Sequence, residues 1–218
     1  NRPIADGSIS HKKALGFSIA LSIISFISLF FLNNFLAAIL AFSGGFFYVV
    51  IYTLYLKRRT IQNIVIGGAA GAFPPLVGYA AINNNLTLES IYLFLIIFFW
   101  TPPHFWALAI MIKDDYAKVN IPMLPVVKGV KNASMQILLY SILLVFITIL
   151  IVTISPSLGW IYVISSIILG IILIIKAFYL FKIQDRTSAV SIYKYSLIYL
   201  FLLIGFIMID SSINFLEI

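Results

Sequence analysis

Long apolar runs separated by short polar segments dominate the sequence. Seven of these runs contain nineteen or more residues, which is enough for a helix to cross about 30 Å of hydrocarbon. The period-two alternation of a membrane β-strand is absent. We therefore predict an all-α integral membrane protein that forms a single domain over residues 1–218. The predicted spans are Ala14–Leu32, Phe35–Leu56, Ile64–Ile82, Leu88–Ile112, Ala133–Ile154, Trp160–Phe181 and Tyr195–Phe215.

The composition agrees with a protein that lies in the lipid bilayer. Apolar residues make up 62% of the chain and charged residues only 10%, whereas about a quarter of a soluble domain is charged. The 218 residues contain no cysteine, which excludes disulfides, thiol catalysis and cysteine metal sites. We attribute the net charge of +7 to membrane topology, and we predict no nucleic-acid partner.

Basic residues are sorted between alternate connections. All 14 Lys and Arg residues lie in four connections or, in the case of Lys176, near the end of the sixth span. The other connections carry none. Because cytoplasmic loops are enriched in Lys and Arg, we predict a multi-pass protein with these four connections in the cytoplasm: Arg2–Lys13, Lys57–Asn63, Lys113–Asn132 and Lys182–Lys194.

The second span ends in an aromatic and then a cationic cluster. Tyr48, Tyr52 and Tyr55 are spaced i, i+4 and i+7, which predicts one stripe on an α-helix, and the triplet Lys57-Arg58-Arg59 follows. The tyrosines suit an interfacial aromatic belt or a π-rich wall that stabilises a carbocation. The cations suit a topology anchor or a clamp for a diphosphate.

Glycine and proline mark the third and fourth spans. Gly67 and Gly71 form a Gly-x-x-x-Gly pair, which predicts the close approach of two helices. The pair Pro74-Pro75 removes backbone donors in mid-span. Such free backbone is tolerated in a membrane where it faces protein or a cavity, so we expect the third span to bend around an internal pocket. Pro102-Pro103 repeats the pattern in the fourth span.

The stretch from Trp100 to Lys128 is the best candidate for chemistry. Its His104 is either a hydrogen-bonding residue between helices or a functional group, as ionisable residues in membranes tend to be. Its adjacent Asp114 and Asp115 form either a solvated loop or part of a Mg²⁺ site, because Mg²⁺ prefers carboxylates and bridges to phosphates. If the helix continues, His104 and Asp115 share a face about 16 Å apart, which predicts a long pocket with metal at its mouth.

Four blocks of the sequence resemble a known family. They run over Tyr52–Asn63, Gly67–Gly78, Trp100–Ile110, which includes Thr-Pro-Pro-His-Phe-Trp, and Asp115–Gly129, which includes Ile-Pro-Met-Leu-Pro-Val-Val-Lys. Together they are similar to the protohaem IX farnesyltransferases (haem O synthases) of the UbiA superfamily of intramembrane prenyltransferases. The last three spans match only in hydropathy.

The resemblance implies a nine-helix bundle of which seven helices are visible. Members of the family carry a first aspartate-rich motif after helix two, in a run that ends like Arg-Thr-x-x-Arg-Pro. Asn1-Arg2-Pro3 resembles the end of that run. We therefore expect the first two helices and the first acidic motif to be absent from this sequence, with the second motif at Asp114 and Asp115.

The resemblance also implies an activity, namely transfer of a farnesyl group from farnesyl diphosphate to a vinyl group of haem B, with addition of water, to give haem O. The implied cofactor is Mg²⁺, ligated by Asp115 together with Asp114. His104 would contact the haem, as an axial ligand or as a proton acceptor. The implied diphosphate-binding and site-lining residues are Lys57, Arg58, Lys128, Asn63 and Tyr52.

The resemblance places such a protein in the bacterial inner membrane, upstream of haem A synthase and of terminal oxidase assembly. Three alternatives stay open. A related enzyme would prenylate a quinone precursor instead of haem. A transporter would use the broken third and fourth helices as a midplane binding site. An inactive fragment would serve only as a helical scaffold.

Overall fold

The structure is a computed structural model that describes residue 4 and residues 6–216, with side chains to residue 213. The described residues form helices and contain no strand. The elements are α1 (His11–Leu32), α2 (Phe35–Phe46), the π-helix η1 (Phe47–Leu56), α3 (Asn63–Asn83), α4 (Leu88–Met111), α5 (Lys113–Lys118), α6 (Leu124–Val127), α7 (Gly129–Leu150), the 3-10 turn η2 (Ile151–Thr153), α8 (Trp160–Ile183) and α9 (Arg186–Leu216).

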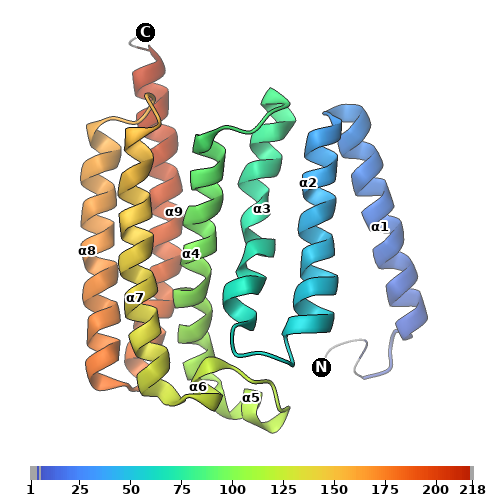
Figure 1. The fold of residues 1–218 in the computed structure, drawn as a ribbon, viewed down its shortest axis with the longest axis vertical. Coiled ribbons are helices and arrows are strands. Elements are labelled where there is room, and N and C mark those ends of the chain that lie inside the picture. The colour runs from blue at the N-terminus through green and yellow to red at the C-terminus, as the bar shows by residue number, and fades with distance from the viewer. Residues whose placement is uncertain (1–3, 5, 217–218) are drawn as a thin grey trace.

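The predicted all-α membrane architecture is confirmed. Seven helical segments within the described residues are long and apolar enough to cross a membrane, and each one coincides with a predicted span. They run alternately up and down, and short turns join them (Figure 1). In lipid, a helix satisfies its own backbone groups, which is why each long apolar run adopts this form.

Two of the predicted polar connections are largely helical in the structure, so their predicted extents are wrong. α9 begins at Arg186, so the expected polar connection Lys182–Lys194 shortens to the turn at Gln184 and Asp185. The expected polar connection Lys113–Asn132 contains α5, α6 and the first turn of α7. Hydropathy marks where a helix leaves the hydrocarbon, not where its hydrogen bonding ends. Helices that project beyond the bilayer therefore look like loops in the sequence.

The helix α4 is the centre of the bundle. It packs against α3 on one side and against α7 and α9 on the others, as Figure 1 shows. Tyr162 of α8 and Tyr199 of α9 are fully buried. Tyr162 donates a hydrogen bond to the Thr148 carbonyl oxygen of α7 at 2.8 Å, and the Tyr199 hydroxyl lies 3.1 Å from Thr148 Oγ1. These polar contacts lock α7, α8 and α9 together.

Asp210 joins the last turns of α9 to the start of α8 through hydrogen bonds. Its side chain is only 2% exposed, although a position so near the end of the last span suggests an interfacial residue. Asp210 Oδ2 accepts hydrogen bonds from the Gly159 and Tyr162 backbone N–H groups, at 2.6 and 3.0 Å. The carboxylate of α9 therefore satisfies free N–H groups at the start of the neighbouring α8, where the helix dipole favours negative charge.

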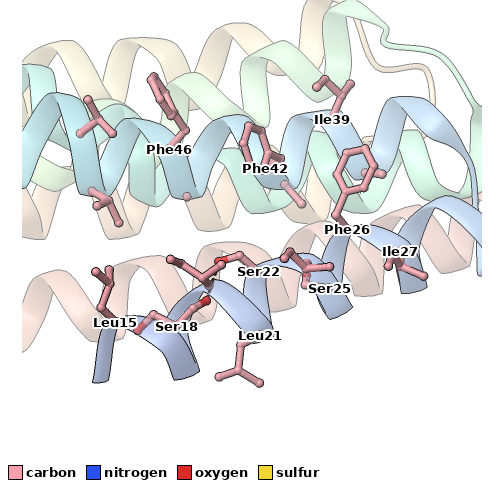
Figure 2. Close-up of a pocket in the computed structure, with 17 residues that line it drawn as sticks. Leu15, Ser18, Leu21, Ser22, Ser25, Phe26, Ile27, Ile39, Phe42 and Phe46 are labelled. Carbon is pink, nitrogen blue, oxygen red and sulfur yellow. Dashed lines mark hydrogen bonds between the residues drawn. The ribbon is translucent and has the colours of Figure 1, made fainter. Parts of the chain in front are cut away.

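The helix α1 stands apart from this core. None of its residues is buried, and its main neighbour is α2. A cavity of about 910 Å³ lies between α1 and α2 (Figure 2). Phe26 of α1 and Phe42 of α2 contact each other edge to face in its wall, with ring centroids 6.1 Å apart. The cavity walls are mainly apolar, because the hydroxyls of Ser18 and Ser22 donate to carbonyls of their own helix.

Candidate active site

Cationic residues gather at one end of the bundle, which we call the basic end. It comprises the connection from Lys57 to Gln62, the helices α5 and α6, and the turn between α8 and α9, all at the lower end of Figure 1. The connections at the opposite end, 33–34, 84–87 and 154–159, contain no Lys or Arg. The basic end is therefore suited to bind an anion, because its charges converge from several elements.

The tyrosine cluster does not form the predicted single stripe. Residues 47–56 form a π-helix, in which the Lys57 N–H donates to the Tyr52 carbonyl oxygen five residues earlier. The wider turn keeps the Tyr48 and Tyr52 rings together, with centroids 5.7 Å apart, but it rotates Tyr55 away. Tyr55 is exposed and stacks under the Arg59 guanidinium at 4.4 Å. Spacing alone could not reveal this change of helix period.

Tyr52 is the tyrosine that faces the interior. It is half-buried and packs on Gly67 of α3, where an added Cβ would lie 2.3 Å from a Tyr52 ring carbon. The predicted close helix approach is therefore found at Gly67. Gly71 has nothing within 4 Å of such a Cβ, so the second glycine of the pair does not take part. Gly68 approaches Thr101 of α4 instead.

Asn63 joins two connections of the basic end. Its side chain is fully buried at the start of α3. Nδ2 donates to the carbonyl oxygen of Thr60 at 2.7 Å and lies 3.4 Å from that of Lys57 and 3.5 Å from that of Pro122. Asn63 Oδ1 is buried and has no hydrogen-bond partner among the described residues. The amide therefore holds the cationic connection after η1 against the segment between α5 and α6.

The two carboxylates lie on a separate short helix. The helix α4 ends at Met111, and Ile112 has φ −119° and ψ 33° before α5 begins. The helix therefore does not continue from His104 to Asp115, so the condition on which the shared face was predicted is not met. Asp114 and Asp115 stand exposed in the first turn of α5, and Asp115 pairs with Lys118 at 3.3 Å.

This donor set fits a Mg²⁺ ion that a substrate helps to hold. The described residues contain no group of three or more potential His, Cys, Asp or Glu ligands. Two adjacent exposed carboxylates are nevertheless enough for Mg²⁺, which usually keeps waters and completes its coordination with substrate phosphates. A tightly held ion with only protein ligands is not supported, because the two aspartates would have to supply the whole site.

Tyr116 lies beside the carboxylates of the basic end. It follows Asp115 on α5 and is half-buried. Burial raises the pKa of Tyr116 above its ordinary value, because loss of water disfavours the phenolate. The hydroxyl therefore stays protonated at neutral pH and can donate a hydrogen bond at the basic end.

The remaining predicted cations lie around this centre. Lys57 is half-buried at the end of η1, and Arg58 and Lys128 are exposed. Lys128 directly precedes α7, and its N–H donates to the Leu124 carbonyl oxygen at 2.8 Å. Asn63 therefore contacts the segment between α5 and α6 through the Pro122 carbonyl oxygen, and the other predicted site residues, apart from His104, lie at the same end of the molecule.

His104 occupies a different part of the structure. Its side chain is 6% exposed and faces α9. Nδ1 lies 2.8 Å from Ser196 Oγ, and the ring stacks on those of Trp100 and Tyr193 with centroids 4.4 and 4.6 Å away. About 10 Å of helix separates His104 from the end of α4, at about 1.5 Å per residue. The imidazole therefore lies in the α4–α9 interface.

Two cavities among the described residues are lined by none of the predicted site residues. The larger one lies between α1 and α2. The smaller one has about 280 Å³ and lies between α3, α4 and α9, with Pro75 in its wall. Its walls are apolar. The expected cavity beside Pro74-Pro75 is therefore found, but neither cavity joins His104 to the carboxylates.

Sequence reasoning missed Ser196 and Tyr193, which hold His104, and Pro122, which holds Asn63. Both α9 residues belong to the region that matched the known family only in hydropathy. Their one visible signal is that Tyr193 and Ser196 lie three residues apart, which places them on one face of a helix.

Seven helices that are long and apolar enough to cross a membrane, with paired carboxylates and clustered cations at one end, define a helical membrane protein. Comparison with protein families then identifies the chain. The model of the UbiA prenyltransferase family matches residues 1–211. The chain belongs to the UbiA prenyltransferase family, which confirms the resemblance seen in its motifs.

Curated relatives named protoheme IX farnesyltransferase are similar over nearly the whole chain. The Thermus thermophilus protein is 49% identical over 212 residues, which are 97% of this chain and 35% of that protein. The Neorickettsia sennetsu protein is 46% identical over 213 residues, 98% of this chain and 70% of that protein. The Gloeobacter violaceus protein is 50% identical over 215 residues, again 98% and 70%. The chain thus spans about a third of the first relative's length.

A solved structure of a digeranylgeranylglyceryl phosphate synthase has the same fold. It superimposes with a TM-score of 0.77 and covers 97% of this chain and 74% of that chain. The sequence identity is 19%, so this likeness speaks for the fold alone.

Proposed function

We propose that the protein transfers a farnesyl group from farnesyl diphosphate to a vinyl group of haem B, which gives haem O and diphosphate. The observation that carries the proposal is the meeting of the Lys57–Arg59 connection with the carboxylate-bearing segment, tied by the buried Asn63. Such an end suits a metal-bound diphosphate. The names of the curated relatives described above support haem as the acceptor.

The reaction breaks the C1–oxygen bond of farnesyl diphosphate, the π bond of the vinyl group and one O–H bond of water, and it forms one carbon–carbon and one carbon–oxygen bond. The bond between C1 of the farnesyl group and the diphosphate oxygen breaks, and diphosphate leaves with the electron pair. A vinyl carbon of haem B forms a bond to C1. Water then adds to the cation left on the other vinyl carbon and loses a proton. Mg²⁺, when bound, supplies positive charge that stabilises the departing diphosphate.

The residues of the basic end would bind and orient the diphosphate. Asp114 and Asp115 are exposed on α5 and would hold the Mg²⁺. Lys57, Arg58 and Lys128 would neutralise the remaining phosphate charge, and Arg is well suited to bidentate phosphate contacts.

The tyrosines would face the reacting carbon from the protein interior. Tyr52 lies one turn from the cations and is half-buried. Its π-face can stabilise an allylic cation, which water would otherwise quench. Tyr116 can donate a hydrogen bond to an anionic oxygen, because its hydroxyl stays protonated.

His104 would contact the haem, as an axial ligand of the iron or as a proton acceptor. Its imidazole packs among aromatic rings of α4 and α9, a setting that suits a large flat macrocycle nearby. Because basic loops face the cytoplasm, we place the basic end on the cytoplasmic side of the bacterial inner membrane. The product would supply a haem A synthase and the assembly of terminal oxidases.

Diphosphate release with different acceptors tests this proposal. Membranes that contain the complete gene product are incubated with farnesyl diphosphate, Mg²⁺ and either haem B or an aromatic quinone precursor. We expect release that requires both haem B and Mg²⁺. Release with the quinone precursor alone would assign the protein to a different prenyl acceptor. If no acceptor gives release, the enzyme assignment is wrong and transport becomes the hypothesis to test.

A further inference from the structure

The hydrogen bonds around Ser196 determine which nitrogen of His104 carries the proton. Ser196 is fully buried on α9. Its hydroxyl lies 2.7 Å from the Tyr193 carbonyl oxygen and 2.8 Å from His104 Nδ1. A carbonyl oxygen only accepts, so the hydroxyl must donate to it, and a serine hydroxyl has only one hydrogen. Ser196 Oγ is then the acceptor toward the imidazole, and His104 Nδ1 is the donor.

The environment of the ring favours a neutral imidazole with a defined orientation. No carboxylate contacts His104 among the described residues, and a buried cation without a partner is costly at membrane depth. The Trp100 indole N–H donates to the Ser196 carbonyl oxygen at 2.7 Å. Trp100 and His104 of α4 therefore both hydrogen-bond to the same residue of α9. The stacked rings of Trp100 and Tyr193 restrict rotation of the imidazole.

The other ring nitrogen remains available. His104 Nε2 makes no hydrogen bond to the described residues, and it is not among their fully enclosed unpartnered polar atoms. A neutral imidazole with its proton on Nδ1 has a lone pair on Nε2. Histidines that bind metals commonly have their tautomer fixed in this way by a hydrogen bond from the other nitrogen.

We propose that Ser196 is a positioning residue that fixes His104 in the Nδ1–H tautomer and so presents the Nε2 lone pair to the substrate. Both roles proposed for His104, iron ligand and proton acceptor, need that lone pair. The purpose of the lone pair rests on the proposed function, whereas the tautomer itself rests only on the geometry. Trp100 and Tyr193 assist, because Trp100 hydrogen-bonds to the Ser196 backbone and both rings stack on the imidazole.

Nitrogen-15 NMR of histidine tests the tautomer without any substrate. The complete gene product is labelled with ¹⁵N-histidine and reconstituted in lipid, and the signals of His104 are those lost in His104→Gln. We expect a protonated-type signal for Nδ1 and an unprotonated-type signal for Nε2. The reverse assignment in the wild-type protein would overturn the proposal, even if no Ser196 variant can be purified.

Two substitutions then separate positioning from packing. Ser196→Ala removes the acceptor, so we expect a mixture of tautomers and a loss of haem O formation of about 10- to 100-fold, the effect typical of removing such an outer contact. Ser196→Thr keeps the hydroxyl and should retain the wild-type spectrum and most of the activity. A wild-type spectrum in Ser196→Ala would contradict the proposal.

The NMR spectrum tests the role of Ser196, and haem O formation tests the proposed function, so the two hypotheses can be rejected independently. If His104 has the expected tautomer but the protein produces no haem O, the proposed function fails and the role of Ser196 stands. If haem O forms while Nε2 carries the proton, the proposed function stands and the role of Ser196 is wrong.

Discussion

At the scale of single residues, two buried polar side chains organise the candidate site. Asn63 holds two connections of the basic end, and His104 joins α4 to α9 through Ser196. Asn63 Oδ1 is buried without a hydrogen-bond partner among the described residues, and such an atom costs free energy. His104 Nε2 is not enclosed in this way and makes no hydrogen bond to the described residues, so its lone pair remains open.

Asn63→Asp tests the first of these residues. A carboxylate cannot donate to the carbonyl oxygens of Thr60, Lys57 and Pro122, and its charge would be buried beside them. We expect the free energy of unfolding to fall by about 1–3 kcal/mol or more, measured as a lower thermal midpoint in detergent. The control is Asn132→Asp, an exposed position in the first turn of α7, which should leave the midpoint unchanged. Equal midpoints for the two variants would contradict the role of Asn63.

Asp115→Asn tests the metal-binding carboxylates. The substitution keeps the shape of the side chain but removes the charge that Mg²⁺ needs. We expect diphosphate release to fall by about 100-fold or more, the size seen when one contact to developing charge is lost. Asp185→Asn removes an exposed carboxylate at the same end of the bundle and serves as the matched control. If both variants lose activity equally, only the overall charge matters and α5 holds no metal.

At the scale of elements, the π-helix η1 and the helix α3 fit together through Gly67. Gly67→Ala would place a Cβ 2.3 Å from Tyr52 Cδ2, so the ring or the helix must move. We expect destabilisation of about 1–3 kcal/mol, as in other overpacked sites, together with reduced activity because Tyr52 is displaced. Gly71→Ala has open space and should be neutral or slightly stabilising, since alanine favours helix. Thermal midpoints of both variants provide the test, and equal loss in the two would refute this packing.

Most of the helical elements, but not their local breaks, could be predicted from the sequence. The seven spans followed from length and hydropathy, because the bilayer imposes both. The break at Ile112 and the π-helix at 47–56 could not be read in this way, because each depends on packing against neighbours. The cations and carboxylates of the site were visible as clusters. Ser196 was not, because an isolated serine in an apolar span is indistinguishable from one that bonds its own backbone.

At the scale of the whole molecule, positive charge is segregated to one end of the bundle. The basic end collects three of the connections, whereas the opposite end is closed by uncharged turns and by the buried Asp210. α1 is the least integrated helix, with no buried residue and an apolar cavity between it and α2. The chain therefore has a firmly packed part that extends from α2 to α9, and α1 packs loosely at its edge.

Labelling of single cysteines tests the orientation of the molecule. The 218 residues contain no cysteine, so Ala117→Cys on α5 and Asn85→Cys in the opposite turn each introduce a distinct thiol, both at exposed positions. We expect an impermeant thiol reagent added outside intact cells to label Asn85→Cys alone. Labelling of Ala117→Cys in the same cells would reverse the topology. Lysed cells, in which both thiols should react, provide the control.

The mass of the haem product tests the central claim most directly. Membranes with the complete gene product are supplied with haem B, farnesyl diphosphate and Mg²⁺ in water enriched in oxygen-18, and the extracted haem is weighed by mass spectrometry. The account predicts a product heavier than haem B by one farnesyl group and one hydroxyl that carries the heavy oxygen. A haem of unchanged mass, in membranes where diphosphate is nevertheless released, would show that the farnesyl group goes to another acceptor.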